Sequence, residues 1–181
     1  KRERVQISSI HREGTRPVLR EVVNSDTDTQ RICYLDALRE AIGEAADNGG
    51  LTAVIVQDKQ RMRWLEKQLS NTALSREKND TPAGKKQDVL PHNKPLVTVV
   101  TSQDTLPAQG VVLLDLALAK GLEFDRVIIA DAQAEVYGND ELSRRRLYTA
   151  ISRAMHRVTI VSQGPMTPLL TAHLKDGCAD I

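Results

Sequence analysis

Short apolar runs alternate with longer amphipathic segments along most of the chain. Leu51–Val56 is an apolar run rich in β-branched residues, and 111–116 and 126–130 repeat the pattern. Runs of this kind are typical of strands buried on both faces of a parallel sheet. Turn residues and β-branched content predict further strands over 17–23, 96–100 and 157–162.

The segments between these runs have helical periodicity. A first helix is expected after Ser25 and Asp26, with Asp28 completing a capping box, and it should end at Asn48-Gly49-Gly50. Its apolar face is predicted to contain Ile32, Leu35, Leu38, Ile42 and either Ala45 or Ala46. The same spacing predicts helices over 61–69, 141–155 and 166–174, whereas the polar segment 70–94 reads as a long loop. Strands alternating with helices predict an α/β domain with a mostly parallel sheet and helices on both faces.

Length and composition describe one ordinary domain. The chain has 181 residues and a formal charge of +1, so no global field draws in nucleic acid. Cys33 and Cys178 form neither a disulfide framework nor a zinc spacing, and Cys33 is expected in the core. We expect a cytoplasmic location without a membrane span. The chain begins at Lys1 without methionine, which predicts a fragment of a larger protein.

Two segments carry the candidate chemistry. The first, 115–125, passes through Lys120, Gly121 and Glu123 between two predicted strands, and the second, 144–156, presents several arginines along a predicted helix. An acidic turn followed by an arginine-bearing helix makes half of a nucleotide site, and the sequence has no Gly-x-x-x-x-Gly-Lys-Ser/Thr phosphate loop. Because ligands of open parallel sheets bind at the carboxyl ends of strands, we expect Lys120, Gly121 and Glu123 at that edge.

These segments resemble motifs V and VI of superfamily I helicases of the UvrD, Rep and PcrA type. The form Leu-Ala-Lys-Gly-Leu-Glu-Phe-Asp at 118–125 is closer still to HelD-like, helicase IV-related ATPases that act on RNA polymerase. The resemblance is clear from about residue 51 to about residue 162. It implies a three-layer RecA-like domain of the P-loop NTPase type over 1–181, the second domain of a two-domain motor.

The resemblance also implies a role for each site residue. Arg153 would be the catalytic arginine finger on the γ-phosphate, Glu123 would contact the nucleotide sugar, and Gly121 would let the backbone approach phosphate. The alternatives are that Arg153 is a surface arginine paired with a carboxylate, that Glu123 caps a helix or a turn, and that Gly121 is an ordinary turn glycine. Lys120, Arg144 and Arg145 are implied in motif support and coupling.

The implied cofactor is ATP with Mg²⁺. The phosphate loop and the magnesium ligands are expected in an N-terminal RecA-like domain of the same protein, so the isolated fragment is predicted to be monomeric and inactive. The four histidines show no metal-binding spacing. The expected partners are that domain and either DNA or RNA polymerase, and a non-catalytic interaction module is a third alternative.

Some positions depart from the motifs or leave their role open. Asp115 and Ala117 stand where UvrD-type proteins carry a threonine and a histidine beside the DNA strand. An aspartate repels phosphate, so the fragment does not support DNA translocation. Arg146 replaces an apolar residue and predicts an exposed start to the second motif, whereas the spacing of Tyr148 predicts a core position. A motif IV arginine is not visible.

Overall fold

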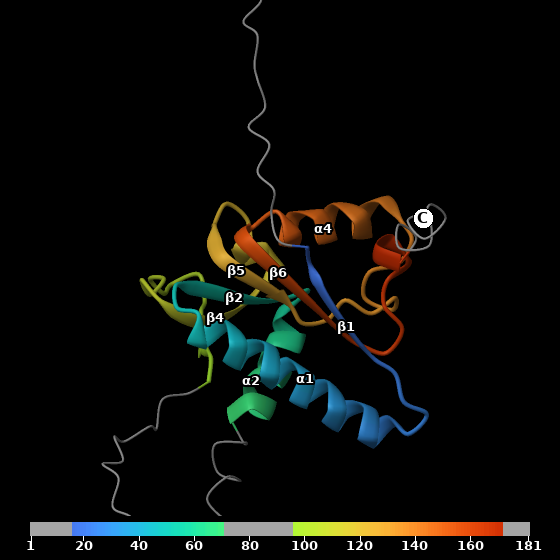
Figure 1. The fold of residues 1–181 in the computed structure, drawn as a ribbon. Helices are drawn as coiled ribbons and strands as arrows, with labels where there is room; N and C mark the ends of the chain where they lie inside the picture. The colour runs from blue at the N-terminus through green and yellow to red at the C-terminus, as the bar shows by residue number, and fades with distance from the viewer. Residues whose placement is uncertain (1–15, 71–95, 172–181) are drawn as a thin grey trace, which may run out of the picture.

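The computed structural model describes residues 16–70 and 96–171, which build a six-stranded, all-parallel sheet with the order β1-β6-β5-β2-β4-β3 (Figure 1). The strands are β1 Val18–Val22, β2 Leu51–Val56, β3 Thr98–Val99, β4 Gly110–Asp115, β5 Phe124–Ile129 and β6 Ala154–Gln163. The helices are α1 Thr27–Asp47, α2 Lys59–Ser70, α3 Leu116–Ala119 and α4 Glu141–Ile151. The predicted α/β class is confirmed.

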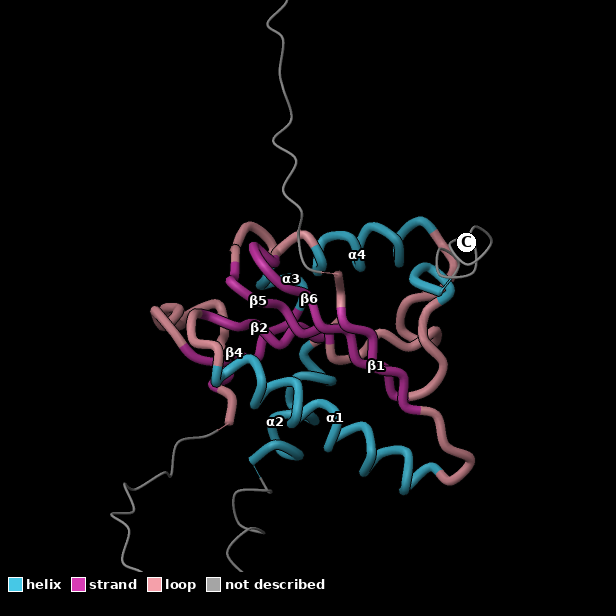
Figure 2. Tube along the Cα trace, viewed as in Figure 1, coloured by secondary structure: helices cyan, strands magenta, loops and turns pink. Residues whose placement is uncertain are grey.

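The helices cover both faces of the sheet, as Figure 2 shows from the side. Val54 and Val56 of β2 pack with residues of α1 and α2, whereas Ala53 and Ile55 pack with residues of α3 and α4. Because successive side chains of a strand point to opposite faces, a strand between two helical layers needs apolar residues at every position. This is why the central strands were visible as uninterrupted apolar runs.

Three predictions for helix α1 are wrong: the capping box, and the core positions of Ile32 and Cys33. Asp26 alone caps it, accepting a hydrogen bond of 2.8 Å from the Thr29 backbone N–H, and no box with Ser25 and Asp28 forms. Ile32 is 57% exposed and Cys33 is also exposed, so neither belongs to the core. The buried face instead begins at Tyr34, whose hydroxyl donates to the Ala130 carbonyl. One residue turns a helix by about 100°, which places Cys33 beside that face and not on it.

Helix α4 is four residues shorter than expected, because the chain leaves the helix after Ile151 and Ala154 already opens β6. The buried residues of α4 are Ser143, Leu147 and Ala150, so the stripe excludes Tyr148. Tyr148 is 73% exposed, and its predicted core position is wrong. The exposed position of Arg146 is confirmed.

The remaining predictions concern the ends of the described ranges. The strand expected over 96–100 is the short β3, and residues 168–171 begin the predicted last helix. The predicted loop lies outside the described residues except for residue 70, which ends α2. Within 16–70 and 96–171, no helix is long and apolar enough to cross a membrane.

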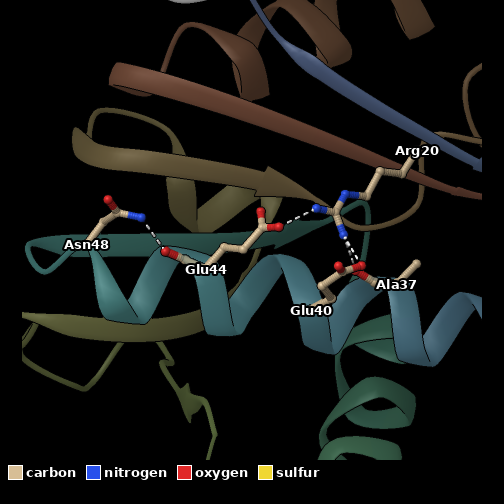
Figure 3. Close-up of polar contacts among 5 residues, drawn as sticks. All are labelled: Arg20, Ala37, Glu40, Glu44 and Asn48. Carbon is tan, nitrogen blue, oxygen red and sulfur yellow. Dashed lines mark hydrogen bonds and ion pairs between the residues drawn. The ribbon is translucent and has the colours of Figure 1, made fainter.

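An ion-pair cluster fastens the edge strand β1 to α1 (Figure 3). The guanidinium of Arg20 lies 2.7 Å from a carboxylate oxygen of Glu40 and 2.8 Å from one of Glu44, and it also donates to the Ala37 carbonyl. Both carboxylates are exposed, so each pair contributes at most about 1 kcal/mol. The cluster therefore orients the helix and adds little stability.

Candidate functional site

The two motif segments meet where β5 and β6 begin. Glu123 directly precedes Phe124, the first residue of β5, and Arg153 directly precedes Ala154, the first residue of β6. Phe124 and Ala154 are paired in the parallel ladder, and the Phe124 backbone N–H donates to the Arg153 carbonyl over 2.9 Å. The fold therefore brings the predicted sugar contact and the predicted arginine finger to neighbouring positions at one edge of the sheet.

That edge is the amino edge, which corrects the expected placement of Gly121 and Glu123. Because β4 and β5 are parallel, the chain must return across the sheet between them, and residues 116–123 make this return. Lys120 follows the four-residue helix α3 directly, whereas Glu123 has already reached the start of β5. The sequence pattern predicts the turn after β4, but it does not show that the connection reaches the opposite edge of the sheet by Glu123.

The carboxyl end of β4 holds Asp115, one of the two positions that depart from the UvrD-type motif. Asp115 is 4% exposed, and its carboxylate caps α3 by accepting a hydrogen bond of 2.9 Å from the Leu118 backbone N–H. This aspartate therefore has a structural role as a helix cap. Ala117, the other departure, is exposed on α3.

Arg153 is half-buried and is oriented by neutral acceptors. Its guanidinium donates to the Thr149 carbonyl over 3.2 Å, to the Leu122 carbonyl over 3.3 Å and to the Ser152 hydroxyl over 3.1 Å. No carboxylate of the described residues forms an ion pair with it. The alternative of a paired surface arginine is thus not met in this part of the chain, and the positive charge remains available to an anion.

The other two residues predicted to bind nucleotide, Gly121 and Glu123, belong to the return connection 116–123, whose Leu122 carbonyl bonds the Arg153 guanidinium. Glu123 is exposed and caps no helix among the described elements. Gly121 has φ of +86°, a conformation that side-chain-bearing residues rarely adopt, and a Cβ there would meet nothing within 4 Å. The turn thus explains the glycine by conformation alone, and its approach to phosphate stays a prediction.

A cationic groove of about 460 Å³ lies between α3, α4 and the carboxyl end of β2. Its charged lining is Lys120, Arg145, Arg146 and a single carboxylate, Asp58, and its other lining residues are Gln57, Leu116, Ala117 and Thr149. Lys120 and Arg145 share this groove, so the two motifs face each other here. The sequence did not single out Gln57 and Asp58, although both directly follow a buried strand.

Arg144 and Arg145 form ion pairs within their own helix. Their guanidinium nitrogens lie 3.3 Å and 2.9 Å from carboxylate oxygens of Glu141, and all three side chains are at least 60% exposed. Exposed pairs of this kind contribute little stability. A contact of either arginine with another domain stays a prediction.

Residues 110–161 match the family described as the UvrD-like helicase C-terminal domain. This segment is therefore similar to that family. It contains β4, β5, α4 and most of β6, and with them Gly121, Glu123 and Arg153. The sequence resemblance is confirmed at this level.

A solved structure has a similar fold over most of the chain. It is the C-terminal domain of a possible DNA helicase from Lactobacillus plantarum WCFS1, with a TM-score of 0.53 and 29% sequence identity. The alignment covers 87% of this chain and 80% of that one. No curated protein matches. The all-parallel α/β sheet is thus consistent with a RecA-like helicase C-terminal domain.

Residues 110–161 also contain a buried carboxyl group that the sequence did not single out. Asp131 follows β5, is fully buried, and accepts a hydrogen bond of 2.7 Å from the Gln57 backbone N–H through Oδ2. Burial raises the pKa of Asp131 to about 6, although this hydrogen bond and nearby Arg61 lower it. Its Oδ1 has no hydrogen-bond partner within the described residues. The one available signal was an aspartate directly after an apolar run.

Arg61 supports this buried end of the sheet from α2. Its guanidinium carbon lies 4.1 Å from the ring centroid of Trp64 and 5.3 Å from that of Tyr34, and one nitrogen donates to Gln163 over 2.7 Å. Stacking of this kind lets a cation lie against apolar surface. Arg61 thereby joins α1, α2 and β6 next to Asp131.

Mg²⁺ takes oxygen ligands, usually one or two carboxylates together with waters and phosphates. Within 16–70 and 96–171, no group of three or more His, Cys, Asp or Glu side chains could hold a metal ion. Magnesium ligands in another domain stay a prediction.

Proposed function

We propose that this domain is the C-terminal half of the ATPase motor of a UvrD-like DNA helicase. ATP would bind between its amino edge and an N-terminal RecA-like domain of the same protein, which would supply the phosphate loop and the magnesium ligands. The observation that carries the proposal is the position of Glu123 and Arg153, directly before two paired parallel strands. The UvrD-like family match over the same residues supports it.

The proposed chemistry needs a cation that its own domain does not neutralise. During phosphoryl transfer, charge spreads over the oxygens of the transferred group, and an arginine from a neighbouring domain contributes about 10³–10⁵ in rate. Arg153 donates three of its five N–H groups, all to uncharged oxygens. One N–H remains on each terminal nitrogen, and two such donors suit a pair of phosphate oxygens.

Glu123 would act on the sugar of the same nucleotide. An exposed carboxylate can accept hydrogen bonds from both ribose hydroxyls. Its backbone is one residue from the strand pair that also positions Arg153. A nucleotide held by Glu123 would therefore be oriented toward the Arg153 guanidinium.

The nucleic-acid strand would meet the opposite edge of the domain. The groove is lined by Lys120, Arg145 and Arg146, of which Arg145 is paired with Glu141, and by the carboxylate of Asp58. Its remaining positive charge favours a polyanion backbone. Lys120 belongs to the same return connection as Glu123, so movement at the nucleotide would be transmitted along 116–123. This agrees with the coupling role that the sequence predicts for Lys120.

The test is the ATPase activity of the full-length protein with and without single-stranded DNA. We expect DNA to stimulate turnover, and Lys120→Glu to reduce the stimulation. Lys67→Glu, which alters an exposed lysine of α2 on the other sheet face, is the matched control and should leave it unchanged.

Two alternatives are separated by the same preparation. Turnover that DNA does not alter, together with recovery of RNA polymerase in a pull-down, would replace the helicase with the HelD-like ATPase. No turnover with either partner, despite an intact phosphate loop upstream, would leave a non-catalytic interaction module. The matching family and the similar solved structure are both described as helicase C-terminal domains.

A further inference from the structure

Ser152 lies between Arg153 and the last turn of α4. It is the C-cap residue of the helix, and its backbone N–H is already bonded to the Tyr148 carbonyl over 2.9 Å. The hydroxyl donates to the Thr149 carbonyl over 3.0 Å and accepts from a terminal nitrogen of Arg153 over 3.1 Å. The hydroxyl thus bonds one of the last four carbonyls of α4, and this Thr149 carbonyl also accepts from Nε of Arg153 over 3.2 Å. Both hydrogen bonds of the side chain therefore tie the end of the helix to the guanidinium.

We propose that Ser152 is a positioning residue that fixes the rotamer of Arg153 for contact with phosphate, an inference that rests on the proposed function. An arginine side chain has several rotatable bonds, and freezing them is unfavourable when the ligand must do it. The Ser152 hydroxyl bonds one terminal nitrogen, the Leu122 carbonyl bonds the other, and the Thr149 carbonyl bonds Nε. Three acceptors at three different nitrogens fix the plane of the guanidinium.

The three oxygens that accept from the Arg153 guanidinium are all uncharged. A carboxylate would hold Arg153 more firmly, but it would also cancel the charge that the transition state requires. A hydroxyl and two carbonyls orient the guanidinium and leave its charge intact. Of the three, only the Ser152 hydroxyl belongs to a side chain, so it can be removed by substitution without altering the backbone.

The Leu122 carbonyl connects this arrangement to the nucleotide loop. Leu122 stands between Gly121 and Glu123, and its carbonyl accepts a hydrogen bond from the Arg153 guanidinium. Two residues further on, the Phe124 backbone N–H donates to the Arg153 carbonyl. Arg153 is thus bonded to this loop through both its side chain and its backbone. A nucleotide that fixes Glu123 would fix one wall of the Arg153 site as well.

The experiment measures kcat and KM for ATP in the full-length protein. Ser152→Ala should lower kcat about 3- to 10-fold, the effect of one lost orienting hydrogen bond, and change KM less than about twofold. Ser152→Thr keeps the hydroxyl and should restore kcat. Ser143→Ala is the matched control, since this serine of the same helix bonds Asp140 over 2.6 Å and should leave kcat unchanged.

A double-mutant cycle separates positioning from a general structural role. In an Arg153→Ala background, Ser152→Ala should cause no further loss of kcat, because the group that it positions is absent. Equal losses in both backgrounds, or a wild-type kcat for Ser152→Ala beside an impaired Arg153→Ala, would overturn the positioning role alone. A wild-type kcat for Arg153→Ala would instead overturn the proposed function.

Discussion

We predict that the buried carboxyl group of Asp131 makes the free energy of unfolding depend on pH. The perturbation is Asp131→Asn, which keeps an oxygen to accept from the Gln57 N–H but cannot ionise. Burial raises the pKa of Asp131 from 3.8 to about 6 in the folded chain. A shift of about 2 pKa units corresponds to about 3 kcal/mol between the two protonation states.

The direction of this pH effect on stability follows from the protons bound by the folded and unfolded chains. Between pH 4 and pH 6 the folded chain binds the Asp131 proton and the unfolded chain releases it, so rising pH favours unfolding. The unfavourable contribution is small below pH 4 and complete above pH 6. Asp26, Asp104 and Asp140 have pKa values lowered by hydrogen bonds, so their stabilising contributions are lost only as the pH falls below about 4, outside this window.

The assay is urea unfolding of the 181-residue chain at pH 4 and pH 7. We expect the free energy of unfolding of Asp131→Asn, relative to wild type, to increase by about 2–3 kcal/mol between these pH values. Asp36→Asn, at an exposed carboxylate of α1, should show no such increase. A constant difference between Asp131→Asn and wild type across the window would refute the assignment of a buried, protonated carboxyl group.

Two further predictions concern the start of β2 and the groove. Gly50→Ala should destabilise the chain by about 2–4 kcal/mol in thermal unfolding, because φ is +77° and the new Cβ would lie 2.6 Å from the Asp125 oxygen that accepts from the Leu51 N–H. Gly49→Ala, with φ of +67° and open space, should cost about 1–2 kcal/mol, and equal losses would contradict the steric argument. In oligonucleotide titrations, the isolated domain should bind single-stranded DNA weakly with a log–log salt slope near −2, about 0.7 for each groove cation, and a much steeper slope would contradict it.

The layers of the fold could be predicted because burial on two sides leaves a simple pattern. Leu51–Val56 was located to the residue, since its alternate side chains enter two different cores. Helix limits were less visible. Ala154 and Met155 fit the helical spacing of α4, yet they begin a strand, because apolar residues at i and i+4 also occur where a helix gives way to a strand.

The site was predictable in its residues and not in its geometry. Glu123 and Arg153 were selected by their motifs, but their common position at the amino edge depends on how 116–123 crosses the sheet. The groove could not be predicted, because Asp58 and Arg145 come from segments far apart in the sequence. The raised pKa of Asp131 depends on burial in the folded chain, where Gln57, Asp58 and Arg61 come from a segment far away in the sequence, and no local pattern encodes this.

The arginine-finger role is tested most sharply by the turnover of Arg153→Ala in the full-length protein, with nucleotide affinity measured separately. We expect kcat to fall by about 10³-fold or more with little change in affinity, because the charge acts mainly in the transition state. Arg31→Ala, at an exposed arginine of α1 on the opposite face of the sheet, should retain wild-type turnover. Wild-type turnover by Arg153→Ala would contradict the arginine-finger assignment.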